Sequence, residues 1–359
     1  ISLGRGKRLR VRVRMSFWAD MPVCRLEIEV HNPSAALHPR GLWDLGDAGS
    51  LFFKDLSLIV SSYSPVERAE IVPEQGASPV VGMGETLLLY QDSSGGDHWD
   101  SPNHVNRFGR LTVSFPGYRI LSGGKMVAEG MRATPYASIR SSHGVAVAGV
   151  VGCWENFPKA LEVSPKNLRI GLFPSECAAG FELQGGEKKR HIVWLGFGGE
   201  IEDAPNTTRL LLPPVLRLDP EWVEKSGAVP RLVPEQHDGN KRYLAYVRNA
   251  VRGPHSFLKK REAVDEYGWR HFGDLYADHE AVKHEGEEPF VSHYNNQYDF
   301  VYAAFVHFLR SGDPSWFELF HDLARHVADI DIYHTDGDKA AYNHGLFWHT
   351  DHYLSLIHI

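Results

Sequence analysis

VCRLEIEVH, residues Val23–His31, alternates apolar and polar side chains over its whole length. Successive side chains of a β-strand point to opposite faces of a sheet, so this alternation predicts a strand with one buried face. Arg8–Phe17 alternates in the same way, and its RLRVRVRM run places the arginines together on one face. We interpret that face as solvent-exposed, and we expect the chain to begin as an antiparallel sheet.

The alternating pattern continues to about Pro214. Asn-Pro, Gly-Asp, Ser-Gly-Gly and Pro-Gly breaks separate the apolar runs, and such turn residues are typical of an antiparallel β-sandwich. Further strands are predicted at Leu51–Ser61, Thr86–Tyr90, Leu111–Phe115, Val145–Val151, Leu168–Phe173 and His191–Phe197. The first part of the chain is therefore predicted to be a β-sandwich.

The apolar period changes from two to about 3.6 after the proline-rich and charged stretch Leu210–Glu235. The segment Ser311-Gly312-Asp313-Pro314 carries the signals that end one helix and begin the next. Helices are predicted at Arg242–Val251, Phe257–Val264, Tyr298–Leu309 and Trp316–Ile330. Helix pairs joined by such short turns build α/α toroids, so we expect a multidomain protein in which an incomplete α/α toroid follows the antiparallel β-sandwich.

The 359 residues are enough for two domains, and their pattern suggests the following boundaries. Residues 1–30 are either the end of a preceding β-barrel domain or the first strands of the sandwich, and residues 31–214 form the central sandwich. Residues 215–239 are a linker, and residues 240–353 begin the toroid. Residues 354–359 read LSLIHI, the translation of a common transposase adaptor, and we interpret them as a sequencing scar. We therefore expect a piece of a longer protein, truncated at both ends.

Composition excludes several classes of partner. The 38 basic and 45 acidic residues give a net charge of −7 without a dominant basic tract, so we expect no nucleic-acid partner. Cys24, Cys153 and Cys177 are far apart and include no CxxC pair, which favours buried free thiols over disulfides or a zinc site. No apolar run is long enough to span a membrane, and we expect no membrane partner.

The densest group of proton-transfer residues lies in YNHGLFWHTDHY, residues 342–353. Tyr342, His344 and His349 can donate or accept protons near neutral pH, and Trp348 can stack on a sugar ring. For any single histidine, a hydrogen-bonded core position is an equally good explanation. Burying the whole group would require a partner for every polar atom, so we place the chemistry here.

Two further polar stretches lie in the helical part. YGWRHFGDLYADHE contains Arg270 and Asp274, whose spacing also fits an ordinary ion pair, and its Gly273 permits a sharp turn or a close backbone approach. SHYNNQYD, residues 292–299, leads into the predicted helix Tyr298–Leu309, where backbone N–H groups would face an anion. Simple helix capping by Ser292 or an asparagine is the alternative interpretation.

Three polar stretches lie in the β part. QDSSGGDHWDSPNHVNRFGR, residues 91–110, is a loop long enough to be functional, and its embedded aromatic residues favour an ordered one. WENFPK ends at Lys159. Gly185–Gly186 reads most simply as a hairpin turn, with residues 187–190 as a charged strand face.

Several well-known sites are absent from the sequence, which has no GxSxG, P-loop or HExxH motif. The histidines of HGLFWHTDH do not have the spacing of a helical zinc pair. His349 with Asp351 or His352 remains a less favoured metal site. We predict no metal and no cofactor.

Six stretches in one order resemble the exo-rhamnogalacturonan lyase family, polysaccharide lyase family 26 and its bacterial relatives. They read HPRGLWDLGDAGSLFFKDL, QDSSGGDHWDSPNH, FPKALEV, LQGGEKKRH, GWRHFGDLYADHE and YNHGLFWHTDHY, and the resemblance runs from about His31 to Tyr353. In that family a RIFT-type β-barrel precedes a central β-sandwich, and an α/α toroid follows. The resemblance implies β-elimination of a uronate-containing pectin from its chain end, with the acidic plant polysaccharide rhamnogalacturonan as partner and a secreted or periplasmic location.

Such an elimination needs groups that offset the uronate carboxylate, a base and an acid. From this chemistry we expect Arg270 with Asn295 or Asn343 to neutralise the carboxylate, and Tyr342, His344 or His349 to transfer protons. The candidate catalytic residues are Tyr342, His344, His349, His271 and Tyr294. The candidate substrate-binding residues are Arg270, Asn295, Asn343, Trp348, His352, Trp99, Asn103, His104, Arg107 and Lys159.

Two other classes of function fit parts of the sequence. An α/α-toroid glycoside hydrolase would use a carboxylate pair, such as Asp274 with Asp299 or Glu280. A non-catalytic carbohydrate-binding protein would need only aromatic platforms such as Trp99 and Trp348.

Overall fold

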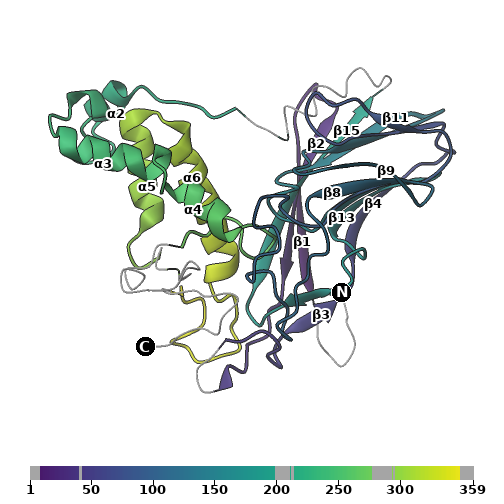
Figure 1. Ribbon diagram of the computed structural model, residues 1–359, viewed down its shortest axis with the longest axis horizontal. Helices are drawn as coiled ribbons and strands as arrows, with labels where there is room; N and C mark the ends of the chain where they lie inside the picture. The colour runs from purple at the N-terminus through teal and green to yellow at the C-terminus, as the bar shows by residue number, and fades with distance from the viewer. Residues whose placement is uncertain are drawn as a thin grey trace.

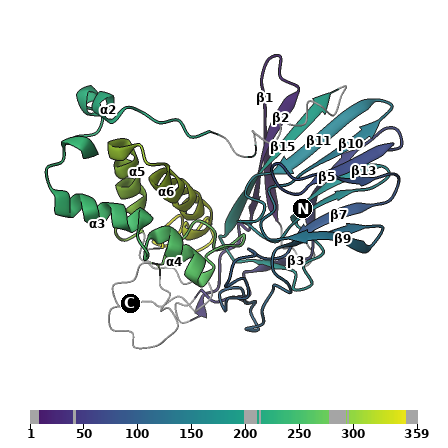
Figure 2. The same ribbon diagram turned by 45° about the horizontal axis from the view of Figure 1, so that its top comes forward.

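Two antiparallel β-sheets pack face to face in the computed structural model, and a group of helices stands beside them (Figure 1). The structure describes residues 9–39, 43–198, 211, 214–276, 293 and 296–347. In Figure 2, α4 (Phe257–Val264) and α6 (Pro314–His326) lie closer to the sandwich than α2 (Pro220–Ser226) and α3 (Lys241–Arg252). The protein is thus mainly an antiparallel β-sandwich followed by a few helices.

The sandwich consists of a seven-stranded and a six-stranded sheet, with a short two-stranded sheet at one end. The seven-stranded sheet has the order β1 (Arg10–Phe17), β2 (Val23–His31), β15 (Lys188–Gly198), β11 (Gly144–Val150), β10 (Tyr136–Ser141), β5 (Arg68–Val72) and β6 (Val80–Gly82). The six-stranded sheet has the order β4 (Leu56–Ser61), β13 (Asn167–Phe173), β12 (Lys159–Val163), β7 (Leu87–Gln91), β8 (Tyr118–Ser122) and β9 (Lys125–Gly130). The small sheet pairs β3 (Leu51–Phe53) with β14 (Phe181–Leu183).

The alternation of β2 has the predicted consequence. Its apolar residues Cys24, Leu26, Ile28 and Val30 are all buried, whereas the charged residues between them are only partly buried. Glu27 and Glu29 on the outer face receive salt bridges from arginines of β1. Because β1 and β2 belong to the seven-stranded sheet, the first described residues are strands of the sandwich.

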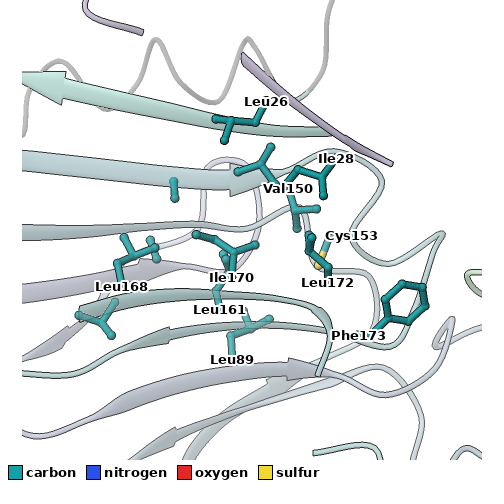
Figure 3. Close-up of a cluster of buried hydrophobic side chains, with 14 of the residues drawn as sticks. Leu26, Ile28, Leu89, Val150, Cys153, Leu161, Leu168, Ile170, Leu172 and Phe173 are labelled. Carbon is teal, nitrogen blue, oxygen red and sulfur yellow. The ribbon is translucent and has the colours of Figure 1, made fainter. Parts of the chain in front are cut away.

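The core lies between the two large sheets (Figure 3). Leu26 and Ile28 of one sheet face the layer formed by Leu161, Leu168 and Ile170 of the other, and each of these side chains is at most 4% exposed. Burying such a side chain contributes about 1.5–3 kcal/mol, so the alternation of the strands is the main source of stability here. Cys24, Cys153 and Cys177 are free and buried, as predicted.

Two local predictions in the β part are wrong. Leu111–Phe115 is not a strand, because only Leu111 forms an isolated bridge, with Val105, inside the long loop. Gly185–Gly186 does form a turn, with Gly186 at φ 75°, but it does not make a hairpin. β14 before the turn pairs with β3, and β15 after it pairs with β2.

The predicted charged face of residues 187–190 is wrong as well. β15 alternates, and its inward-facing positions include Lys189 and His191, which are 5% and 3% exposed. Glu187, just before the strand, is also only 5% exposed. Lys189 and His191 therefore point into the protein, and Arg190 pairs with Asp329 of the helical part at 2.6 Å.

The four predicted helices are present within about two to four residues of their predicted ends. They are α3 (Lys241–Arg252), α4 (Phe257–Val264), α5 (Phe300–Ser311) and α6 (Pro314–His326), and a π-helical turn, η5 (Val327–Asp331), extends α6. Between α5 and α6, Gly312 has φ 66° and ends one helix, and the Asp313 side chain accepts from Ser315 N at the start of the next. The predicted linker also contains α2 (Pro220–Ser226) and the 3-10 turn η3 (Glu235–His237), which were not expected.

The described helices do not form the expected α/α toroid. α5 and α6 pack through aromatic contacts such as Phe308–Phe317 and Phe305–Phe320. Within the described ranges the helices form a small group beside the sandwich and do not close into a ring. None of these helices has the length and apolar character needed to cross a bilayer.

Replacing Ile170 with alanine should lower the free energy of unfolding by about 2–5 kcal/mol, because it leaves a cavity in a close-packed core. Ile59 on the neighbouring strand β4 is 57% exposed, whereas Ile170 is fully buried, so Ile59→Ala is a matched control that should change stability by about 0.5 kcal/mol or less. Urea unfolding of both variants measures the difference. Equal losses from the two substitutions would contradict the assignment of this core.

Candidate functional site

The long loop between β7 and β8 binds the end of α4 through one buried carboxylate. Asp265 is fully buried and ends α4 with φ 53°, in the left-handed region. One of its oxygens accepts from Ser94 Oγ, and the other lies 2.6 Å from His104 Nε2. Asn103 Nδ2 donates to Val264 O at 2.7 Å. Three side chains of the loop thus join the β part to the end of α4 at this point.

A cavity of about 140 Å³ opens next to this junction. Its walls come from the β7–β8 loop, the segment before β12, residues 177–182 and residues 268–271. The aromatic members of the wall are Phe52, Phe108, Phe157, Phe181 and Trp269, and the members that can carry charge are His104, Arg107, Glu182, Arg270 and His271. An apolar lining with a few polar groups is typical of a small-molecule or sugar site.

His104 is held in a fixed orientation in the cavity wall. Nε2 faces Asp265, and the ring edge packs on Phe157 at a centroid distance of 5.0 Å. Its Nδ1 has no hydrogen-bond partner among the described residues, so this atom is the one left for a ligand. The His271 ring is 6.0 Å away in the same wall. Two imidazoles at this distance can act on two atoms of one sugar ring.

The two arginines of the cavity differ in their availability. Arg270 is buried and donates to both carboxylate oxygens of Glu187, at 2.8 and 3.2 Å. Its charge is therefore already offset inside the protein. The Arg107 guanidinium lies over the rings of Phe52 and Phe108, at 4.1 and 4.7 Å, and forms no ion pair with any described residue. Arg107 is the cation that an incoming carboxylate can reach.

A second polar cluster surrounds Tyr342. The Tyr342 ring makes edge contacts with Trp43 and His38, and the His38 ring stacks on Trp43 at 4.1 Å. His38 Nε2 lies 2.6 Å from Asp338 Oδ2, which also accepts from Tyr333 Oη at 2.9 Å. The Tyr342 cluster, as we define it by these five residues, is rich in proton-transfer groups. The Tyr342 cluster is connected to the cavity along the chain, because Leu45 lines the cavity and Trp43 of the cluster is two residues before it.

The neighbours of Tyr342 in the YNHG motif mainly stabilise their own loop. Asn343 exchanges hydrogen bonds with the backbone of Asp338, at 3.0 and 3.1 Å. His344 is exposed and pairs with Asp336 at 2.7 Å. Neither residue lines the cavity beside His104. Tyr294, Asn295, Trp348, His349 and His352 were also predicted to form the site and lie outside the described residues.

The structure brings together part of the predicted site. Asn103, His104, Arg107, Arg270 and His271 all line the same cavity. The 91–110 loop and the segment with Arg270 and His271 therefore meet at one wall, whereas His344 does not belong to it. Trp99 is half-buried elsewhere in that loop and does not line the cavity.

Lys159 lies inside the protein, behind the cavity wall. It is fully buried, and its Nζ donates to the carbonyl oxygens of Asn156 and Pro158 at 2.5 and 3.1 Å. Burial lowers the pKa of Lys159 to about 7. In this conformation its contacts are internal, and a substrate in the cavity would meet Pro158 instead.

Two interpretations based on spacing do not hold. Arg270 and Asp274 do not form the simple ion pair, because Arg270 binds Glu187 and Asp274 lies beside His293 and His326. The carboxylate pair of a hydrolase is not formed by Asp274 and Asp299 either. Asp274 is fully buried, and the Asp299 side chain accepts from Tyr302 N at the start of α5.

Of SHYNNQYD, the structure describes His293 and residues 296–299, and these do not present an anion site at the start of α5. His293 is 1% exposed and lies 3.2 Å from Glu266, and Asn296 donates to Asp331 at 2.8 Å. The cap of α5 is Asp299, three residues after Asn296. Both polar residues therefore face the protein interior.

Sequence reasoning missed Asp265, Glu187 and His38 as members of the two clusters. A signal existed for each: Asp265 directly precedes the EYGWRH motif, Glu187 lies in LQGGEKKRH, and His38 begins HPRGLWDLGD. All three act by orienting or facing another side chain, and spacing along the chain does not reveal that role.

A second cavity, of about 230 Å³, lies between β15 and α6. Burial raises the pKa of Glu155 to about 7, lowers the pKa of Lys189 to about 8, and lowers the pKa of His191 well below its usual range. Acidic residues such as Asp322 share the wall with these basic groups. The mixed charges do not favour one sign of ligand, so this cavity is not the preferred site.

Comparisons with known proteins add little to this picture. The sequence matches no protein-family model and no curated protein. Among solved structures, a "putative aldose 1-epimerase" from Klebsiella pneumoniae matches with 9% sequence identity and a TM-score of 0.28. The match covers 59% of this chain and 52% of that chain, so this chain spans about half the length of that protein. At this level of similarity the functional argument depends on the residues alone.

Lys159→Met should remove one component of the pH dependence of stability. The pKa of Lys159 is about 7 in the folded protein and 10.5 for a free side chain, so between these values the unfolded chain binds a proton that the folded chain does not. Stability therefore rises with pH in this window, by at most about 1.4 kcal/mol per pH unit for this group. Urea unfolding at several pH values should show a smaller rise for Lys159→Met than for the wild type.

The exposed Lys54 supplies the control. Lys54→Met should keep the wild-type dependence on pH, because this substitution leaves the buried amine of Lys159 in place. A Lys159→Met protein with an unchanged slope would show that the buried amine keeps its ordinary titration.

Proposed function

We propose that this protein is a polysaccharide lyase that cleaves rhamnogalacturonan-type pectin by β-elimination at a galacturonate, acting from the chain end. The observation that carries the proposal is one cavity wall that combines His104, oriented by Asp265, with His271 and the available cation Arg107. The ordered resemblance of six sequence stretches to the exo-rhamnogalacturonan lyases supports it. In such an enzyme the helices would belong to an α/α toroid, and the protein would act outside the cytoplasm, where its polymer is found.

The three side chains match the three demands of the reaction. The C5 proton of a galacturonate is difficult to remove while its carboxylate stays charged, and Arg107 would offset that charge. His104 would take the proton, and Asp265 would stabilise the imidazolium that forms. The electrons of the C5–H bond then form the C4=C5 double bond as the C4–O bond breaks. His271, in its protonated form, would give a proton to the leaving oxygen.

The size and lining of the cavity suit one ring of a polymer. Pockets for drug-sized ligands measure about 300–1,000 Å³, and this cavity has about 140 Å³. Phe52 and Phe108 are exposed at its rim and could stack on the adjacent rings of the chain. A chain end with one buried galacturonate fits this arrangement better than a fully enclosed small molecule.

In this proposal the proton-transfer groups are His104 and His271 in the cavity wall and no longer the residues of the YNHG motif. A tyrosine base needs a nearby cation that lowers its pKa, and Arg270 does not supply that cation to Tyr342. Arg270 binds Glu187 instead, and the cation over the Tyr342 ring is Lys339, at 5.4 Å. Tyr342 and His344 remain candidates for binding the polymer next to the cavity.

Replacing His104 with glutamine should lower turnover of rhamnogalacturonan by about a hundredfold or more, the usual effect of losing a positioned acid or base. The assay follows the ultraviolet absorbance of the new C=C bond. His143→Gln is the matched control, because His143 is an exposed histidine of the β10–β11 turn. Wild-type turnover in His104→Gln, together with a strong loss in Tyr342→Phe, would move the chemistry to the Tyr342 cluster. Label from isotopic water in the product without new absorbance would show a hydrolase.

Arg107→Gln should lower kcat/KM on rhamnogalacturonan by about tenfold to a hundredfold, because a charge that neutralises the carboxylate in the transition state is lost. Arg110 is an exposed arginine of the same loop and does not line the cavity, so Arg110→Gln should keep the wild-type value. A neutral, methyl-esterified substrate should narrow the difference between wild type and Arg107→Gln. Equal effects of the two substitutions would show that Arg107 contributes only to the general surface charge and does not bind the carboxylate.

A further inference from the structure

Five buried side chains with metal-binding chemistry meet behind the segment that carries His271. They are Glu266, Asp274, His293, His326 and Asp331, and each is at most 1% exposed. Four separate parts of the chain supply them: the segment after α4, residue 293, the last residue of α6 and the π-helical turn η5. We refer to these five residues as the Asp274 cluster.

Distances within the Asp274 cluster are those of ligands that share an ion. Asp274 Oδ2 lies 3.7 Å from His293 Nε2 and 3.5 Å from His326 Nε2. His293 Nε2 is also 3.2 Å from Glu266 Oε2, and His326 Nε2 is 3.2 Å from Asp331 Oδ1. Charge-assisted hydrogen bonds are shorter, at about 2.7–2.9 Å. Two ligand atoms about 2.1 Å from a tetrahedral zinc ion are about 3.4 Å apart, which matches the observed spacing.

The outer atoms of the same side chains are held by neighbouring groups. His326 Nδ1 lies 3.3 Å from Phe272 O, so its Nε2 is turned toward the carboxylates. Leu275 N donates to Asp274 Oδ1 at 2.8 Å, and Asn296 Nδ2 donates to Asp331 Oδ2 at 2.8 Å. In each case the partner holds one atom and directs the other inward. Metal-binding residues commonly have this second set of contacts, which fixes their orientation.

We propose that the Asp274 cluster binds a divalent transition-metal ion, with zinc as the best fit. Asp274 is the ligand shared by the set that contains His293 and the set that contains His326. The sets Glu266–Asp274–His293 and Asp274–His326–Asp331 each bring three ligand atoms within 4.8 Å of one another. Imidazole nitrogen combined with carboxylate oxygen favours zinc over the purely oxygen-bound calcium or magnesium. A dication also offsets the repulsion among three carboxylates buried close together.

The site is closed, so its role is structural. All five ligands are buried, so the described part of the chain shows no open position for a substrate, in contrast to a catalytic zinc. Glu266 and Asp274 bracket the segment that supplies Arg270 and His271 to the cavity. Gly273, next to Asp274, has φ 108°, and a Cβ there would lie 2.4 Å from Asp322 O of α6, so the segment also packs tightly on the helix. The ion would fasten both ends of this segment to α6 and η5.

Metal content after dialysis tests the proposal directly. Elemental analysis of the purified wild-type chain should find zinc at about one ion per chain or more, and Asp274→Asn should reduce it to background. His321→Gln is the matched control, because His321 is a partly exposed histidine of the same helix α6 and lies outside the Asp274 cluster. It should keep the wild-type content.

Thermal unfolding gives a second readout that does not depend on activity. A strong chelator should lower the unfolding midpoint of the wild type and of His321→Gln, and added zinc should restore it, because an ion that binds only the folded state stabilises it. If Asp274→Asn does not fold, Co²⁺ binding to the metal-depleted wild type replaces it, with visible absorption bands expected for a nitrogen and oxygen site of low symmetry. A wild-type chain that carries no stoichiometric metal, and whose midpoint neither zinc nor cobalt raises, would overturn the proposal.

Discussion

The buried carboxylate of Asp265 is the constraint on which the arrangement of the cavity depends. An ionised carboxylate without partners is very costly inside a protein, and both oxygens of Asp265 are satisfied by side chains of the β7–β8 loop, Ser94 and His104. The same residue ends α4 in a left-handed conformation that aspartate tolerates better than most residues. The loop and the helix end therefore take their positions together, and His104 faces the segment that contains His271.

The sequence predicts best where a pattern is local. The buried face of β2 and the boundary of α5 and α6 at Gly312–Pro314 follow from alternation and capping within a few residues. Leu111–Phe115 was predicted as a strand because it is apolar, although no neighbouring strand pairs with it within the described residues. α2 was missed because a Pro-rich stretch was read as a linker, whereas Pro220 stands at the first helical position, where its missing N–H costs nothing.

The sequence predicted which residues belong to the candidate site better than it predicted which residues contact them. Asn103, His104 and Arg107 on one loop, and Arg270 and His271 on another, were all candidate site residues, and they line one cavity. The partners that orient them were not predictable, because His104 and Asp265 are 161 positions apart and Arg270 and Glu187 are 83 apart. Such pairs depend on how the sandwich packs against the helices, and the local hydrophobic pattern of the sequence does not predict that packing.

The separation of Arg270 from Asp274 shows how the segment between Glu266 and Asp274 becomes rigid. An ion pair between Arg270 and Asp274, as their spacing suggested, would have compensated both charges within the segment. The segment would then have needed no ion pair with the rest of the protein. Instead Arg270 binds Glu187 before β15, while Asp274 and Glu266 face histidines from other parts of the chain. Each anchor attaches the segment to a different element, so the position of His271 is set by the sandwich and the helices at once. In the proposed reaction a catalytic group must be held within about 0.5 Å of its working position, so these anchors would act on that reaction without touching the substrate.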